Sequence, residues 1–172
     1  MRKINSKDID YIAMGSTVLG TGGGGDPYIG KLLAKEAINT YGEVSLIQAE
    51  ELKDDALVLP IAAFGGPMIL VEKLFSGKEF VKAFEIMESY LRRKIDAVMP
   101  AEAGGLNGVI PFSIAAQKQI PLVYADGMGR AFPRLEMVTF ILHDNPVSPI
   151  TQADEKGNKN VYDTISNEWG NS

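Results

Sequence analysis

Hydrophobic residues follow two different spacings along this chain. In four stretches they recur every three or four positions, which is typical of helices with one buried face. These predicted helices span residues 7–19, 27–41, 79–92 and 109–117. Short and nearly continuous apolar runs between them predict strands over residues 44–48, 56–62, 95–99 and 122–125. Strands that alternate with helices indicate an α/β fold, a three-layer sandwich around a mostly parallel sheet.

Particular residues predict where some elements begin and what surrounds them. Ser6 is suited to cap the first helix, and Pro27 fits the first position of the second helix. The run 56–62 is almost wholly apolar, which predicts a strand buried on both faces. Shorter helices are expected near residues 68–74 and 135–142.

The segment 143–149 interrupts the alternation of strands and helices. Beyond it, residues 150–153 and 160–162 flank a polar turn at 155–158, which predicts a C-terminal β-hairpin. We therefore expect an α/β domain over residues 1–145 and a hairpin extension over residues 146–172.

Composition excludes several classes of function. The 172 residues carry 17 basic and 22 acidic side chains, so no basic footprint for nucleic acid or anionic lipid is present. The absence of cysteine excludes disulfides, thiolate metal sites and thiol nucleophiles. No apolar run approaches the roughly 20 residues of a membrane helix. We expect a cytoplasmic protein.

Three of the four predicted α/β strands end in glycine-rich turns, at residues 65–66, 104–105 and 127–129. The carboxyl ends of parallel strands meet at one edge of a sheet, where ligands usually bind. Polar residues accompany these turns, namely Glu102, Asn107, Asp126 and Arg130. The pattern favours a site at this edge, although tight turns alone explain any single glycine pair.

The glycine-rich loop at residues 20–25 matches the dinucleotide pattern G-x-G-x-x-G, but a helix rather than a strand is expected before it. The Walker A pattern is rejected because Leu32 stands where magnesium needs a hydroxyl. The loop still precedes a helix N-terminus, which favours an anion or a polarised carbonyl. The pattern favours a capping role of Asp26 before Pro27 at least as much as a catalytic role.

Acid–base chemistry in this chain falls mainly to carboxylates. No G-x-S-x-G motif is present, and the only histidine, His143, is expected in the last turn of a helix. Asp126, flanked by glycine and close to Arg130, is the main candidate base. Its alternative role is to bind loop amides and pair with Arg130. Oxygen ligands for a metal exist at Asp26, Glu102 and Asp126, but no spacing requires a metal, and the sequence assigns no cofactor.

Three motifs, in order along the chain, resemble the S-methyl thiohydantoin desulfurase-like family. The motifs are Thr21-Gly22-Gly23-Gly24-Gly25-Asp26-Pro27, Gly104-Gly105-Leu106-Asn107 and Asp126-Gly127-Met128-Gly129-Arg130-Ala131-Phe132-Pro133. The resemblance implies a three-layer α/β N-terminal domain that a mostly β domain follows in longer members. The chain ends near Trp169, about where that second domain would begin, so we expect either half of a longer protein or a naturally short member. Arg134 stands where the family pattern has an acid.

The resemblance implies a small cyclic amide or ureide as substrate, such as a thiohydantoin or hydantoin-like ring that water opens or substitutes. Asp126 or Glu102 would activate water, with Asp26 a further catalytic candidate. Substrate would be held by Asn107, Arg130 and the loop amides of Gly22, Gly23, Gly24 and Gly25. The alternative is a non-catalytic domain that binds a hydantoinase/oxoprolinase-type protein. Self-association into a homo-oligomer is also expected.

Overall fold

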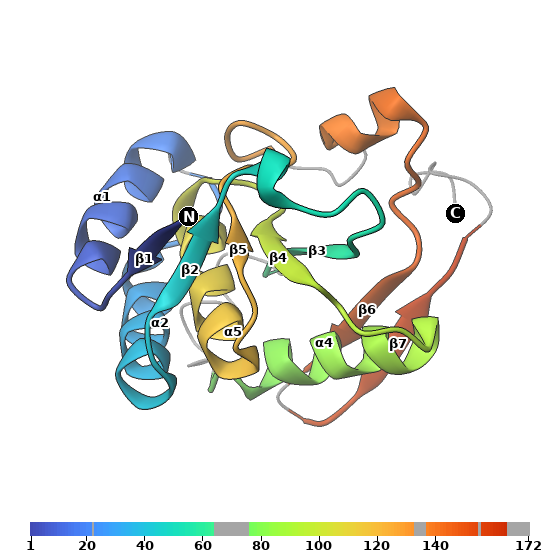
Figure 1. The fold of residues 1–172 in the computed structure, drawn as a ribbon, viewed down its shortest axis with the longest axis horizontal. Coiled ribbons are helices and arrows are strands. Elements are labelled where there is room, and N and C mark those ends of the chain that lie inside the picture. Colours follow the sequence, from blue (N-terminus) through green and yellow to red (C-terminus); the bar gives the residue numbers. More distant parts are fainter. Residues whose placement is uncertain (22, 64–75, 133–136, 155, 165–172) are drawn as a thin grey trace.

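The computed structural model describes residues 1–21, 23–63, 76–132, 137–154 and 156–164 (Figure 1). The helix predicted near residues 68–74 and the glycine turn at 65–66 lie outside this part of the chain. None of the helices in the described ranges is long and apolar enough to cross a membrane.

A five-stranded sheet forms the centre of the fold (Figure 1). Its strands, in spatial order, are β1 (Arg2–Ile4), β2 (Val44–Ile47), β5 (Leu122–Val123), β4 (Ala97–Pro100) and β3 (Val58–Ile61). β1 pairs antiparallel with β2, and the other neighbours are parallel. The predicted α/β class with a mostly parallel sheet is confirmed. β1 escaped prediction because three residues are too few to show a period.

In the described ranges, four α-helices and three 3₁₀ helices accompany the sheet. They are α1 (Asp8–Gly20), α2 (Pro27–Tyr41), α4 (Lys78–Leu91), α5 (Ile110–Lys118), η1 (Ala49–Glu51), η2 (Gly105–Gly108) and η4 (Thr139–His143). All four helices expected from the apolar spacing are present. The prediction that Ser6 caps α1 is wrong, because Asn5 Oδ1 accepts the backbone N–H groups of Lys7 and Asp8 instead. Within residues 135–142, the described part forms the 3₁₀ helix η4 rather than an α-helix.

The hydrophobic core lies on both faces of the sheet. The larger cluster joins one face to the α-helices, with Phe84 of α4 and Ile110 of α5 almost fully buried. A smaller cluster on the opposite face includes Met99 and Val123, and Phe140 of η4 packs against it. Burial on both faces explains the short apolar runs of the central strands.

The expectation that the run 56–62 is a strand buried on both faces is wrong, because Pro60 is exposed and only Ile61 of β3 is buried. β3 is also the last strand of the sheet in the described part of the chain. The carbonyls of Leu57 and Ile61 accept hydrogen bonds from the β4 side. Alternate residues of a strand direct their backbone groups to opposite sides, so Pro60 faces the side on which β3 has no partner strand among the described residues, called the free edge below. An edge position tolerates proline because its missing N–H leaves no ladder bond unmade. The apolar composition instead reflects a cavity beside this edge, described below.

The C-terminal hairpin consists of β6 (Ile150–Ala153) and β7 (Lys159–Tyr162), as predicted (Figure 1). Side-chain hydrogen bonds hold it against α4. Thr151 Oγ1 donates to the carbonyl oxygen of Ala83 at 2.8 Å, and Tyr90 donates to Asp163. Ser148 Oγ donates to the other oxygen of the Asp163 carboxylate at 2.9 Å.

The attachment of this hairpin is expected to weaken in acid. Hydrogen bonds from Tyr90 and then Ser148 hold the pKa of Asp163 below its usual value. The stabilisation is therefore present above the unfolded pKa of about 4 and is lost as pH falls through the lowered folded value. The protection factors of residues 148–154 and 156–164, which compare hydrogen exchange with the intrinsic rate at the same pH, should fall below about pH 4 in the wild-type protein. In Asp163→Asn the protection factors should not fall further in acid, and an equally steep acid response in that variant would contradict the assignment.

Candidate functional site

The carboxyl ends of β4 and β5 bring two of the predicted segments together. The Gly127 amide donates to the Ala101 carbonyl oxygen at 3.0 Å, and the Ala103 amide donates to Asp126 Oδ2 at 3.0 Å. Because these parallel strands are neighbours in the sheet, the loops that follow them leave at the same edge. The structure thus places the segments around Glu102 and Asp126 side by side.

The glycine-rich loop joins them from a distant part of the sequence. The carbonyl oxygens of Gly24 and Gly25 accept the Leu106 amide at 2.8 and 3.2 Å. Arg130 Nη2 donates to Thr21 Oγ1 at 2.9 Å. Three segments separated by up to 109 residues therefore meet at one place.

Close backbone contact explains much of the glycine content here. A Cβ on Gly24 would lie 2.5 Å from the Gly104 carbonyl oxygen, and one on Gly105 would lie 2.5 Å from the Gly25 carbonyl oxygen. Both residues also have positive φ, +72° and +60°. At these positions glycine is needed for the backbone of the loop at residues 20–25 to pack directly on that of residues 104–105, independently of any ligand.

Glu102 and Asn107 form a buried pair, each about 6% exposed. Asn107 Nδ2 donates to Glu102 Oε1 at 2.7 Å, and the Phe132 amide donates to Glu102 Oε2 at 3.2 Å. Asn107 Oδ1 accepts the Ala63 amide at 2.6 Å. Both carboxylate oxygens are thus engaged with neutral donors, and the pair ties the end of β3 to the other loops.

Asp126 is held in a different way. Its Oδ2 accepts the Ala103 and Gly129 amides, at 3.0 and 2.7 Å, while Oδ1 has no hydrogen-bond partner among the described residues. The expected Asp126–Arg130 pair is wrong: Arg130 binds Thr21, and its guanidinium lies 5.7 Å from the centre of the Phe132 ring. The carboxylate is therefore oriented by backbone amides, with one oxygen unengaged.

Asp26 lies at the start of α2, and its contacts there bear on the two roles left open for it, capping and catalysis. Its Oδ1 accepts the Tyr28 amide at 2.8 Å, so the capping role is observed. In the loop, the Gly23 amide donates to the Gly20 carbonyl oxygen and is not free to hold a ligand. The amides of Gly24 and Gly25 have no partner in the described part of the chain. Gly22 lies outside it.

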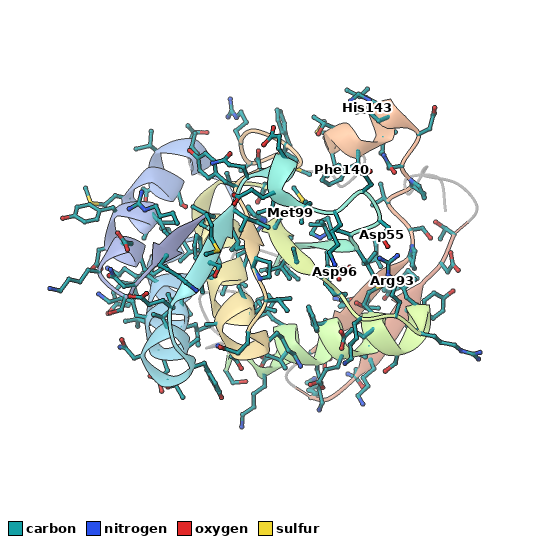
Figure 2. All side chains as sticks on the ribbon, in the orientation of Figure 1. Asp55, Arg93, Asp96, Met99, Phe140 and His143 are labelled. Atoms are coloured by element: carbon teal, nitrogen blue, oxygen red, sulfur yellow. The ribbon has the colours of Figure 1, made fainter. Side chains whose placement is uncertain are left out.

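Other candidate chemistry does not gather at this edge. The loop follows helix α1 rather than a strand, which removes the context of a dinucleotide fingerprint. His143 ends the 3₁₀ helix η4 and is exposed (Figure 2). Among the described residues, no three acidic or histidine side chains lie close enough together to hold a metal ion. Arg134 is outside the described ranges.

Two contact residues escaped prediction as site members, although both stand inside the quoted motifs. Thr21 receives the Arg130 guanidinium, and Phe132 supplies both an amide for Glu102 and a ring beneath Arg130. The only signal in the sequence was their position inside these motifs. Contacts between segments so far apart do not produce a regular spacing of residues that a sequence could reveal.

Comparisons with known proteins agree with this architecture. The family model described as "S-Me-THD-like, N-terminal domain" matches residues 7–164. A crystal structure of a structural-genomics protein from Chromobacterium violaceum superposes with a TM-score of 0.80 at 23% identity. The alignment covers 96% of this chain and 46% of that one, so this chain spans about half its length. At this identity the likeness shows the fold. No curated protein matches the sequence.

Proposed function

The chain belongs to the S-Me-THD-like family, as its N-terminal domain, and on this premise we propose that it carries hydrolytic groups for a small cyclic amide or ureide. A thiohydantoin or hydantoin-like ring is the substrate class that the family name suggests. The observation that carries the proposal is the Asp126 carboxylate, which two backbone amides orient at one oxygen while the other stays unengaged.

Asp126 supplies the base in this proposal. Its Oδ1 takes a proton from water while the water oxygen bonds to the ring carbonyl carbon. The C–N bond of the ring then breaks, and the proton passes from Asp126 to the departing nitrogen. The amides that hold Oδ2 fix the direction of Oδ1, which is the positioning that general base catalysis needs.

Neighbouring groups are suited to the charge that develops on the ring oxygen. The unpartnered amides of Gly24 and Gly25 belong to the loop that packs on residues 104–106. The exposed guanidinium of Arg130 uses Nη2 for Thr21 and has further N–H groups for a carbonyl or carboxylate. Preorganised donors of this kind stabilise an oxyanion in acyl chemistry.

Glu102 acts through other residues in this arrangement. Both of its oxygens are already bound, so it positions Asn107 and the backbone of Phe132 rather than accepting a proton from water. Asn107, buried and bonded on both ends of its amide, is likewise a positioning residue.

Ring-opening assays on a panel of hydantoins and thiohydantoins test the proposal. Asp126→Asn should lower kcat about a hundredfold, because the amide still accepts backbone N–H groups but cannot take a proton. Glu102→Gln should also lower activity about a hundredfold, through displaced neighbours, and should raise KM as well.

A matched control is available in the C-terminal hairpin. Asp154 also accepts backbone amides, those of Lys156 and Asn158, but lies in the hairpin turn between β6 and β7. Asp154→Asn should leave turnover unchanged. Full activity in both the Asp126 and Glu102 variants would discard the proposed roles.

One observation favours a second candidate function, a non-catalytic domain that binds a hydantoinase/oxoprolinase-type protein. Three of the four carboxylate oxygens of Glu102 and Asp126 brace the loops, a use that requires no substrate. This alternative would be supported if the chain co-purified with such a protein and opened no ring either with or without it.

A further inference from the structure

A cavity of about 570 Å³ lies beside the outer edge of β3 and extends to Ala101, the residue that precedes the Glu102 loop. One wall is β3 with its flanking residues, and a second is the inner face of α4. Val138 and Phe140 form a third, and the segment 145–151 lines the outer side. In Figure 1 this region lies between β3, α4 and β6; Figure 2 labels Met99 and Phe140, which line it.

Among the described residues, the lining contains no charged side chain. Its polar side chains are Asn145, Ser148 and Thr151. The Ser148 hydroxyl is engaged with Asp163, and the Thr151 hydroxyl with the Ala83 carbonyl. A charged ligand would lose its hydration here without gaining an ionic partner, at a high cost. The cavity therefore fits an uncharged molecule.

The sheet edge nevertheless offers fixed hydrogen-bonding groups. Val58 and Pro60 alternate with the residues that bond to β4, so the Val58 N–H and C=O and the Pro60 C=O face away from it. None of these groups has a partner in the described part of the chain. An apolar cavity with a few such groups is the usual composition of a small-molecule site, and its volume lies within the usual range of roughly 300–1,000 Å³.

We propose that this cavity binds an uncharged, largely apolar small molecule that hydrogen-bonds to the free edge of β3. A polypeptide strand fits less well. Pro60 removes one N–H from the edge, a feature that discourages strand addition. The outer side is also occupied by the segment 145–151, which Ser148 and Thr151 anchor to the rest of the fold. The proposal is independent of ring hydrolysis at the glycine-rich edge.

An uncharged fluorescent probe, N-phenyl-1-naphthylamine, tests the cavity in the full 172-residue chain. We expect saturable fluorescence enhancement with wild-type protein. Ala83→Leu, which extends a half-buried α4 side chain into the cavity, should weaken binding at least about tenfold, because the added carbons occupy the probe's volume. Lys82→Leu adds the same side chain to an exposed position of the same helix and should bind the probe as the wild type does.

Methyl NMR of the wild-type protein provides a reading that needs no variant. The probe should shift the signals of Val58, Met87 and Ile150, which line three sides of the cavity. Shifts confined to other methyl groups, or unchanged affinity in a folded Ala83→Leu protein, would overturn the proposal. Equal affinity for the anionic 8-anilinonaphthalene-1-sulfonate would also overturn it, as would displacement of the probe by an extended apolar peptide, which would indicate strand docking.

Discussion

Replacing Gly105 with alanine should lower the free energy of unfolding by about 3 kcal/mol, the sum of two costs. The first is the backbone conformation, since φ is +60° at this position. The second is steric, because the new Cβ would lie 2.5–2.6 Å from backbone atoms of Gly24 and Gly25, which no rotamer change can relieve. For a chain of this length the melting temperature should fall by roughly 10 °C.

Gly129→Ala separates the two costs. Gly129 has a similar φ of +77°, but nothing lies within 4 Å of the position a Cβ would take. This variant should lose only about 1 kcal/mol, the conformational part alone. Thermal or denaturant unfolding of both proteins measures the difference. Equal losses would mean that the loop at residues 20–25 does not pack on residues 104–105 as the structure shows.

Asn107→Asp should cost about 3 kcal/mol at neutral pH, as expected when a buried charge is left without a compensating partner. The new carboxylate would take the place of an amide nitrogen that lies 2.7 Å from Glu102 Oε1. Two carboxylates would then meet where both residues are about 6% exposed, with neutral donors around them. The change in volume is minimal, so the loss measures the electrostatic requirement for a neutral residue at position 107.

An asparagine-to-aspartate substitution at an exposed contact in the hairpin provides a matched control. Asn158 Nδ2 donates to Asp154 Oδ2 at 2.6 Å, an amide–carboxylate contact of the same type but exposed. Asn158→Asp should cost under about 1 kcal/mol because water screens the repulsion. Urea denaturation of both variants compares the two sites. Similar losses would contradict the buried character of the Glu102–Asn107 pair.

Local patterns were sufficient for most of the fold. The helical spacing in residues 27–41 and 79–92 predicted α2 and α4 to within a residue or so, because an amphipathic helix reports its own buried face. The alternation of elements also indicated the parallel sheet. In the same way, glycine turns after β4 and β5 predicted a shared edge, since strand direction alone determines where those turns lie.

Side-chain partners at the candidate site were less predictable. Arg130 was expected beside Asp126, four residues away, yet it binds Thr21, which is 109 positions distant. The sequence offers Asp126 or Glu102 as the base, and the structure adds that both oxygens of Glu102 accept hydrogen bonds, from Asn107 and Phe132. Sequence separation does not indicate which of several compatible donors lies within hydrogen-bond distance of a given carboxylate in the folded chain.

The chain's own pattern thus determined its α/β class, the order of its main helices and strands, and the edge at which its glycine turns gather. Only the tertiary structure decided that β3 stands at the edge of the sheet, that β1 joins it, and that a cavity opens beside Pro60. The physical reason is the range of the interactions. Periodicity records how each segment meets its immediate surroundings, whereas lateral strand order and enclosed volume depend on segments that meet only after the chain has folded.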